Sequence, residues 1–494
     1  MGLIKKLAGD TVLYGASSII GRFLNYLLVP LYTSVFIPSE YGVVTELYAY
    51  VAFLNVIYVF GLETTYFRFC NEAGADEQKV FNQIQSAVLL TTAIFSIVLI
   101  SFSGEISSIL GYSGRSNLIV WMAIILAIDA VVAIPFARLR QQGKARKFAT
   151  TKLINIIANV FLNLAFIVWL PSLNSGSPLI SMIHNPEWGV EYIFISNLVA
   201  NTLLILLLAK SFYAFKPYFS FQEFKPFLLY SYPILFTGLA GVTNEMLSRA
   251  MLKYWLPENF YPGQSNLTAL GIFGACYKIA VFMTLAVQAF RYAAEPFFFS
   301  NASNKNSPEL FATVMNWFVI FGSLAFLVIS TNLDIVGFIF LRSEAYREGL
   351  FIVPYLLMGG LFLGIYYNLS VWYKLTDKTI YGAIISSGGA LITILFNLLL
   401  IPVLGYLGSA ITTLLTYFAM STWSYLLGQK HYPIPYYLSK AIIYIVLSSV
   451  LILICNYLNT DLTSTVLCRI GATLVFILFV YFQEKQNLRN IFNR

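Results

Sequence analysis

Residues 117–136 read NLIVWMAIILAIDAVVAIPF, a run in which Asp129 alone carries a charge. A membrane-spanning helix needs about 20 predominantly apolar residues, because each residue adds about 1.5 Å of rise and the hydrocarbon layer is about 30 Å thick. This run therefore predicts a helix that crosses a membrane.

The same pattern continues along the whole chain. Of the 494 residues, 59% are hydrophobic and only 11% are charged, whereas soluble domains carry about 25% charged residues. Hydropathy, with Gly, Pro and charged clusters as boundaries, predicts fourteen spans near 11–36, 41–68, 80–102, 117–137, 149–170, 188–209, 232–254, 267–299, 308–329, 348–372, 379–401, 408–427, 438–458 and 464–482. The predicted fold class is an all-α integral membrane protein with fourteen transmembrane helices and no separate soluble domain.

The residues that usually hold metals or form disulfides are few and scattered. They are Cys70, Cys276, Cys455, Cys468, His184 and His431. No CxxC or Cys/His spacing occurs among them, so the sequence predicts no disulfide framework, no metal site and no cofactor.

Lysine and arginine residues predict the orientation, because positively charged loops are retained in the cytoplasm. With the N-terminus inside, 21 of the 30 fall on the cytoplasmic side, and only Arg115, Lys253, Arg342 and Arg347 fall outside. Both termini are therefore expected in the cytoplasm. The same asymmetry accounts for the net charge of +8, so no nucleic-acid partner is expected.

Two sets of residues recur at nearly constant spacing, which indicates an internal duplication. Gly42 and Tyr48 of span 2 stand six positions apart, and Gly271 and Tyr277 of span 8 repeat that spacing. A second set recurs later in each half: Lys144 stands nineteen positions before Asn163, and Lys378 stands nineteen positions before Asn397. Arg140 and Lys374 are in register as well.

The duplication predicts two six-helix lobes and two additional C-terminal helices. Because each half holds an even number of spans, the repeat is parallel, about an axis along the membrane normal. The expected parts are an N-lobe at 1–215, a cytoplasmic linker at 216–230, a C-lobe at 231–427, and spans 13 and 14 with a cytoplasmic tail at 428–494.

Polar and charged residues inside the spans predict the binding site. A charge at mid-membrane costs at least about 2.5–3.5 kcal/mol, so it usually faces a partner or a water-filled cavity. The six candidates for a substrate-binding cavity are Ser18, Arg22, Asn25, Glu245, Arg249 and Lys278. Those of span 1 follow one helical stripe, and Glu245 and Arg249 of span 7 stand at i, i+4, where a purely structural ion pair is the alternative.

Five further charged residues are candidates for gating or coupling: Glu63, Arg68, Asp129, Arg291 and Glu295. Glu63 with Arg68, and Arg291 with Glu295, lie near cytoplasmic ends, where snorkelling or gating salt bridges are expected. Asp129 has two open interpretations, a coupling-ion or proton site and an interhelical hydrogen bond.

A cavity with more cations than anions suits an anionic substrate, since the planar guanidinium of arginine binds phosphate oxygens in a bidentate manner. The apolar outer faces of the spans are expected to contact membrane lipid.

The sequence at 397–414, NLLLIPVLGYLGSAITTL, resembles the N-L-x-L-I-P-x-x-G-x-x-G-A-A-x-A-T signature of polysaccharide flippases of the Wzx type, within the MATE/MOP exporter superfamily. Ser409 and Thr412 depart from the usual alanines. Further similar segments are Pro38 to Gly42 and Leu229 to Pro233, and the resemblance extends over the whole chain.

This resemblance implies a non-enzymatic flippase of the bacterial cytoplasmic membrane, with a central cavity formed mainly by spans 1, 2, 7 and 8. Its substrate would be an oligosaccharide on a polyprenyl diphosphate, and its partners polysaccharide polymerase and glycosyltransferases. Spans 13 and 14, at 438–482, would hold the lipid tail. Family arginines in span 1 match Arg22, but the aspartate that often follows is Phe23 here, and the span 7 aspartate of relatives matches Glu245 only approximately.

Two other functions fit a protein of this class. A MATE-like ion-coupled drug antiporter would ordinarily need acidic cavity residues, of which Glu245 and Asp129 qualify. A membrane polysaccharide polymerase or ligase would need a substantial external loop, whereas the longest external segments, about 171–187 and 330–347, are short and poor in acidic, Arg or His clusters.

Overall fold

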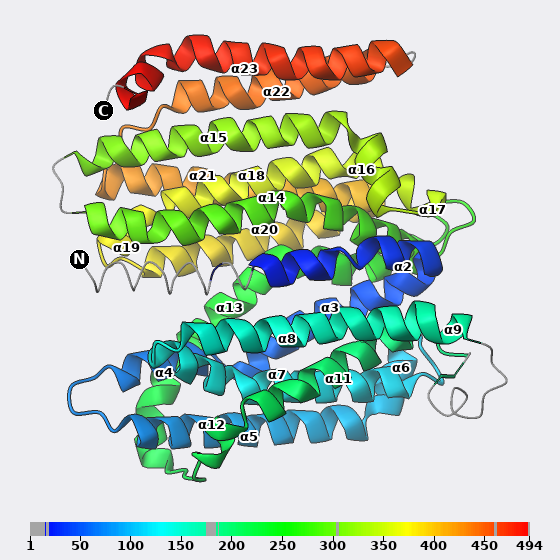
Figure 1. Ribbon diagram of the computed structural model, residues 1–494, viewed down its shortest axis with the longest axis vertical. Coiled ribbons are helices and arrows are strands. Elements are labelled where there is room, and N and C mark those ends of the chain that lie inside the picture. The colour runs from blue at the N-terminus through cyan, green and yellow to red at the C-terminus, as the bar shows by residue number, and fades with distance from the viewer. Residues whose placement is uncertain are drawn as a thin grey trace. The chain divides into compact units, whose positions relative to one another are not determined.

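The chain is a helical, multi-pass membrane protein. The computed structural model describes residues 15, 19–173, 184, 185, 187–302, 306–458 and 462–492, and every regular element within them is a helix (Figure 1). Eleven of these helices are long and apolar enough to cross a membrane, and Ile19–Val35 and Glu191–Leu207 are shorter apolar helices. Each expected span contains a helix, while the count of fourteen membrane crossings stays a prediction.

The span expected near 408–427 lies in a helix that is not among these eleven. This helix, α21 (Tyr406–His431), buries hydroxyl side chains, among them Ser409, Thr412, Thr413 and Thr416. Their hydroxyl groups lower the mean hydropathy of this helix, which explains why hydropathy alone does not select it.

The chain divides into two compact units, Met1–Gly271 (unit 1) and Ile272–Arg494 (unit 2). The division lies within α14 (Asn266–Asn301) and not in the expected linker at 216–230. The reason is that α13 (Phe221–Trp255), the expected first helix of the second lobe, packs against two helices of the first half, α3 (Pro38–Val59) and α4 (Leu62–Cys70). The boundaries of the repeat themselves stay a prediction.

Unit 1 is organised around one buried helix, α7. Its helices after Ile19–Val35, whose last part is α2 (Val29–Val35), are α3, α4, α5 (Glu77–Ser101), α6 (Ser103–Ile109), α7 (Ser116–Gln141), α8 (Ala145–Leu164), a π-helix at Ala165–Trp169, α9 (Leu170–Ser172), α11 (Glu191–Leu207), α12 (Ala209–Tyr213) and α13. The neighbours of α7 include α3, α5 and α11, and α8 packs against α11. Because these helices surround α7, its apolar residues occur on all sides of the helix and not on one face.

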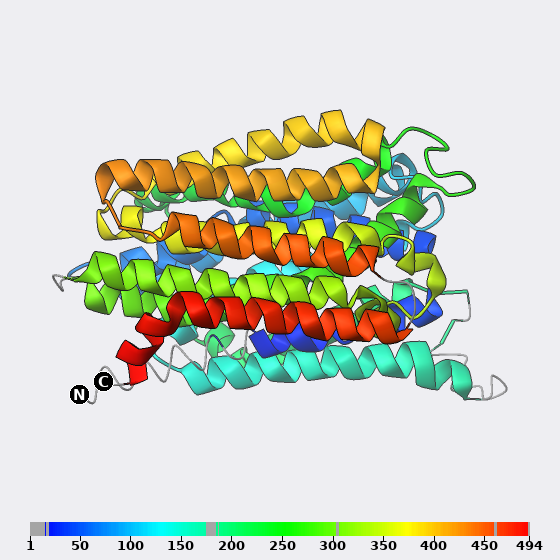
Figure 2. The same ribbon diagram turned by 90° about the horizontal axis from the view of Figure 1, so that it is seen from above.

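Unit 2 contains the remaining helices. These are most of α14, then α15 (Ser307–Thr331), α16 (Leu333–Phe340), α17 (Glu344–Arg347), a 3₁₀ turn at Leu350–Ile352, α18 (Val353–Leu369), α19 (Val371–Leu375), α20 (Ile380–Leu404), α21, α22 (Leu438–Tyr457) and α23 (Leu462–Phe492). The helix α18 packs against α15 and α21, and the hairpin of α22 and α23 lies against α15 (Figure 2).

The segment that carries the family resemblance forms the α20–α21 hairpin. Gly405 has a φ of 58°, which lets the chain reverse between the two helices. Asn397 is fully buried and accepts a hydrogen bond from Ser409 Oγ at 3.3 Å, while its amide donates to the carbonyl of Thr393 at 2.8 Å. The residues of this signature therefore have a structural role in closing a helical hairpin.

Two glycines that match in the repeat let helices cross closely within unit 1. A Cβ at Gly42 of α3 would overlap the carbonyl oxygen of Leu267, and a Cβ at Gly271 would overlap the carbonyl oxygen of Pro38. Pro38 and Leu267 are related by the same offset in sequence as the two glycines. The starts of α3 and α14 therefore touch through reciprocal backbone contacts.

Candidate functional site

The structure brings three charged candidates together around two tyrosines in unit 1. We call Arg22, Tyr26, Tyr41, Glu245 and Arg249 the arginine cluster. The charges of Arg22, Arg249 and Glu245 lie within electrostatic range of the Tyr26 hydroxyl, and that of Arg249 also acts on Tyr41. The cluster joins the helix at Ile19–Val35 to α3 and α13, and two guanidinium groups against one carboxylate make its net charge positive.

The two arginines differ in exposure. Arg22 and Glu245 are exposed, whereas Arg249 is only 9% exposed and donates to the sulfur of Met246. Packing holds the guanidinium of Arg249 in place, whereas the exposed guanidinium of Arg22 can change its position. Two such hydrogen-bond donors suit a group with several anionic oxygens.

The other cavity candidates are placed as follows. Asn25 is exposed and accepts a hydrogen bond from Asn159 Nδ2 of α8 at 3.3 Å. Lys278 lies in unit 2 on α14 and is half-buried, so its expected proximity to the arginines stays a prediction. Ser18 lies outside the described residues.

A second polar cluster of unit 1 is absent from the sequence-based predictions. The carboxylate of Glu46 on α3 is fully buried and accepts from Lys253 Nζ at 2.7 Å, Tyr254 at 2.8 Å and Tyr50 at 2.9 Å, and also from Tyr112. We call these five residues the Glu46 cluster. The same Lys253 amino group donates to the carbonyl oxygen of Leu110 at 2.6 Å, so it is both neutralised and hydrogen-bonded.

The sequence contains a signal for the Glu46 cluster. Like Asp129, Glu46 is a carboxylate inside an apolar span. The charge count, however, places Lys253 in an external segment, and Lys253 stands 207 positions after Glu46. The repeated step of four residues from Gly42 through Glu46 to Tyr50 puts all three on one face of α3.

The coupling candidate Asp129 forms an interhelical hydrogen bond. Asn201 Nδ2 of α11 donates to its carboxylate at 2.9 Å, and Asn155 Nδ2 of α8 donates to Asn201 at 3.0 Å. Lys152 lies within electrostatic range and places its amino group 4.4 Å from the centre of the Phe136 ring. The interhelical hydrogen bond that one interpretation of Asp129 expects is therefore present, and a coupling role stays a prediction.

The gating candidate of unit 1 has a different partner from the one expected. Glu63 pairs with Arg140 of α7, not with Arg68, because residues five apart on a helix point to different sides. Arg68 instead lies 4.5 Å over the Tyr230 ring and 3.8 Å from the exposed carboxylate of Glu72.

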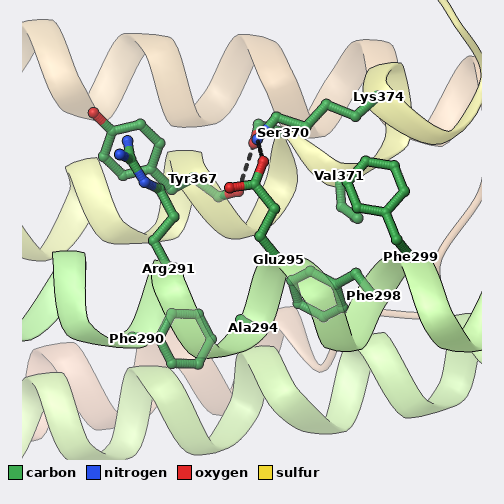
Figure 3. Close-up of a pocket in the computed structure, with 10 residues that line it drawn as sticks. All are labelled: Phe290, Arg291, Ala294, Glu295, Phe298, Phe299, Tyr367, Ser370, Val371 and Lys374. Atoms are coloured by element: carbon green, nitrogen blue, oxygen red, sulfur yellow. Dashed lines mark hydrogen bonds and ion pairs between the residues drawn. The ribbon is translucent and has the colours of Figure 1, made fainter. Parts of the chain in front are cut away.

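The corresponding candidate of unit 2 also has a different partner. Figure 3 shows Glu295 facing Lys374 of α19. The two charged groups form an ion pair of 2.6 Å, and the Arg291 guanidinium lies 4.9 Å over the Tyr367 ring. The cavity beside them encloses about 20 Å³, room for one water molecule, so it cannot accept a substrate. Arg140 and Lys374, which the predicted repeat places at matching positions, each pair with a glutamate, Arg140 with Glu63 and Lys374 with Glu295, while the repeat itself stays a prediction.

Unit 2 also contains an apolar groove of about 520 Å³. Its lining residues come from α15, α18, α21, α22 and the segment before α22, and include Asn316, Phe362, Ile365, Phe418, Tyr425, Tyr436, Ala441, Ile442 and Ile445. The Asn316 side chain is buried, and its Oδ1 atom has no hydrogen-bond partner among the described residues. The groove has the size and apolar lining that a hydrocarbon chain needs.

Comparisons with known proteins identify the fold. No family model matches the chain, and no curated protein matches it. Among solved structures, the lipid II flippase MurJ in an inward closed conformation superposes with a TM-score of 0.70 at 15% identity, covering 96% of this chain and 99% of that one. MATE family transporters of the MOP superfamily superpose as well: an inward-facing one has a TM-score of 0.63 at 13% identity and covers 85% of this chain and 94% of its own.

An outward-facing MATE transporter superposes with a TM-score of 0.55 at 12% identity and covers 86% of this chain and 95% of its own. At these identities the likeness describes the fold alone. The chain therefore has the fold that these flippases and transporters share.

Proposed function

We propose that this protein is a flippase and not an enzyme. It moves a polyprenyl-diphosphate-linked oligosaccharide from the inner to the outer leaflet of the bacterial cytoplasmic membrane, for surface polysaccharide synthesis. The observation that carries the proposal is the arginine cluster, in which the charges of two guanidinium groups lie within electrostatic range of a tyrosine hydroxyl inside a membrane protein of flippase-like fold.

The physical requirement on such a protein is to keep the diphosphate and sugars out of hydrocarbon, where their lost hydration costs many kcal/mol. Arg22 and Arg249 replace water around the phosphate oxygens with charge-assisted hydrogen bonds. Tyr26, which is only partly buried, adds a hydroxyl group and an aromatic face for the adjoining sugars.

The lipid part of the substrate needs a separate apolar surface. The groove of unit 2 supports this, because its lining offers hydrocarbon contact along α22 and the hydroxyl groups of Tyr425 and Tyr436. In this proposal the polyprenyl chain occupies the groove while the headgroup is transferred.

Alternating access completes the proposal. The shared fold has been solved facing inward and outward in MATE transporters, which supports transfer by exposure to one side at a time. With both termini in the cytoplasm, each negative charge moved outward gains about 2.3 kcal/mol per 100 mV of inside-negative potential. Glycosyltransferases would supply the substrate and a polymerase would consume it.

Replacing Arg22 or Arg249 with glutamine should lower surface glycan at least tenfold and cause lipid-linked glycan to accumulate in the inner leaflet. Each change removes a charge-assisted hydrogen bond of about 1.5–3 kcal/mol, equivalent to a factor of about 10–100. Surface glycan, lipid-linked glycan and the amount of protein in the membrane are measured together in a deletion host.

The matched control is Arg146→Gln, which removes an exposed arginine at the start of α8. It should leave export unchanged. Normal surface glycan in both the Arg22 and the Arg249 variants would contradict the proposed headgroup site.

Filling the groove should also impair export. Replacing Ala441, which lines the groove, with tryptophan places an indole in the space assigned to the polyprenyl chain, so transfer should fall severalfold without loss of protein. Ile443 is 45% exposed on the same helix and is not part of the lining, so Ile443→Trp is the control. Equal export by the two variants would refute the assignment of the groove.

A MATE-like ion-coupled drug antiporter is the second candidate, and the exposed carboxylate of Glu245 in the arginine cluster favours it. An antiporter predicts that deletion increases sensitivity to cationic drugs with no change in surface glycan. A flippase predicts that deletion lowers surface glycan and leaves the sensitivity to cationic drugs unchanged.

A further inference from the structure

Two of the four cysteines meet in the structure although thirteen positions separate them. The Sγ atoms of Cys455 on α22 and Cys468 on α23 are 3.1 Å apart, and both thiols are free. A disulfide requires an S–S distance of about 2.05 Å, so a movement of about 1 Å brings the sulfurs to bonding distance. The helices α22 and α23 pack against each other and already hold the two side chains face to face.

The two cysteines lie near the closed end of the α22–α23 hairpin. Cys455 is two positions before the end of α22 at Tyr457, and Cys468 is six positions after the start of α23 at Leu462. The opposite end of the hairpin carries Lys440 and Lys485, and cation-rich ends face the cytoplasm. In the proposed orientation, the cysteine pair therefore lies towards the external compartment.

Charged side chains beside the cysteine pair are typical of the boundary between membrane and water. Arg469, next to Cys468, forms an ion pair of 3.0 Å with Asp334 of α16, whose side chain is 61% exposed. Cys468 is partly exposed, whereas Cys455 is buried at 5%. An incoming oxidant therefore reaches Cys468 first.

We infer that Cys455 and Cys468 form a disulfide on the external side of the membrane that ties α22 to α23. The oxidant is a disulfide of the extracytoplasmic compartment. The Cys468 thiolate attacks one of its sulfurs and releases one thiol, and the Cys455 thiolate then displaces the second. The pair loses two electrons and two protons, and the oxidant disulfide becomes two thiols.

The consequence of this bond concerns the groove. The helix α22 forms one wall of the groove, and the disulfide fixes the far end of that wall to α23. The inference rests on the proposed orientation and not on the proposed substrate.

The test uses the full-length protein produced in bacteria with an oxidising external compartment. Free thiols are blocked with N-ethylmaleimide under denaturing conditions, disulfides are then reduced, and the new thiols are labelled with a polyethylene-glycol maleimide. The wild type and Cys70→Ser/Cys276→Ser should each gain two labels, whereas Cys455→Ser or Cys468→Ser should gain none.

Mass spectrometry gives an independent measurement. No Lys or Arg lies between Lys440 and Arg469, so trypsin releases both cysteines in one peptide, and the disulfide lowers its mass by two hydrogen atoms. Absence of label after reduction in both the wild type and Cys70→Ser/Cys276→Ser would overturn the inference, whatever those proteins transport. If the wild-type protein contained the disulfide but did not export lipid-linked glycan, the proposed function alone would be contradicted.

Discussion

Replacing Lys253 with methionine is expected to destabilise the protein by about 3 kcal/mol, or to remove it from the membrane. The Lys253 and Glu46 side chains are 15% and 0% exposed, and removing one partner of a buried ion pair usually costs about 3–5 kcal/mol, because a buried charge stays without compensation. Tyr50 and Tyr254 continue to donate to Glu46, so the lower end of that range applies. The measurement is the thermal unfolding of purified protein in detergent, with the membrane level of the variant beside it.

The chain offers a matched control with nearly the same separation. Lys79 and Glu223 are 2.8 Å apart, but their side chains are 50% and 43% exposed. Lys79→Met should therefore leave the thermal unfolding of the protein nearly unchanged, because an exposed ion pair contributes little to stability. Adding Glu46→Gln to Lys253→Met removes the uncompensated charge and should restore stability. If Lys253→Met were as mild as Lys79→Met, the Glu46 cluster would not stabilise unit 1.

Replacing Gly271 with valine should be comparably damaging. A Cβ at this position would overlap the Pro38 carbonyl oxygen, and it would lie 2.7 Å from the carbonyl carbon and 3.0 Å from the Gly42 nitrogen. These are backbone atoms, which no change of rotamer can move. The cost should therefore reach or exceed the upper end of the range of about 1–3 kcal/mol for overpacking.

Gly42→Val should behave as Gly271→Val does, because its Cβ would overlap the Leu267 carbonyl oxygen. A Cβ added at Gly241 on α13 would have no atom within 4 Å, so Gly241→Val is the control and should be nearly neutral. Thermal unfolding of the three variants tests this. An equal effect at all three positions would mean that helix propensity, and not the backbone crossing, determines the result.

The sequence predicted those features of the fold that depend on local composition. Hydropathy located the helices because a membrane helix satisfies its own backbone hydrogen bonds and needs only an apolar exterior. It could not place α13, because the packing of that helix against α3 and α4 depends on contacts between residues far apart in the chain.

Charged residues within spans are a useful guide, but their partners are not predictable from sequence. Depth in the membrane selects Arg22, Glu245 and Arg249, and all three charges lie within electrostatic range of Tyr26. The nearest cation in sequence to Glu63 is Arg68, whereas Arg140 is its partner in space. The spacing rules for cysteines did not predict that Cys455 and Cys468 lie close together, because those rules do not cover cysteines on the two helices of a hairpin.

The distance in sequence between Glu46 and Lys253 has a consequence for biosynthesis. The ribosome completes Lys253 207 residues after Glu46, about 10–40 s later at a rate of roughly 5–20 residues per second. During this interval the carboxyl group has no cation to pair with, so the nascent chain must keep it protonated, hydrated or shielded by the insertion machinery. A product truncated before span 7 would carry this defect permanently and would be recognisable to membrane proteases as incomplete.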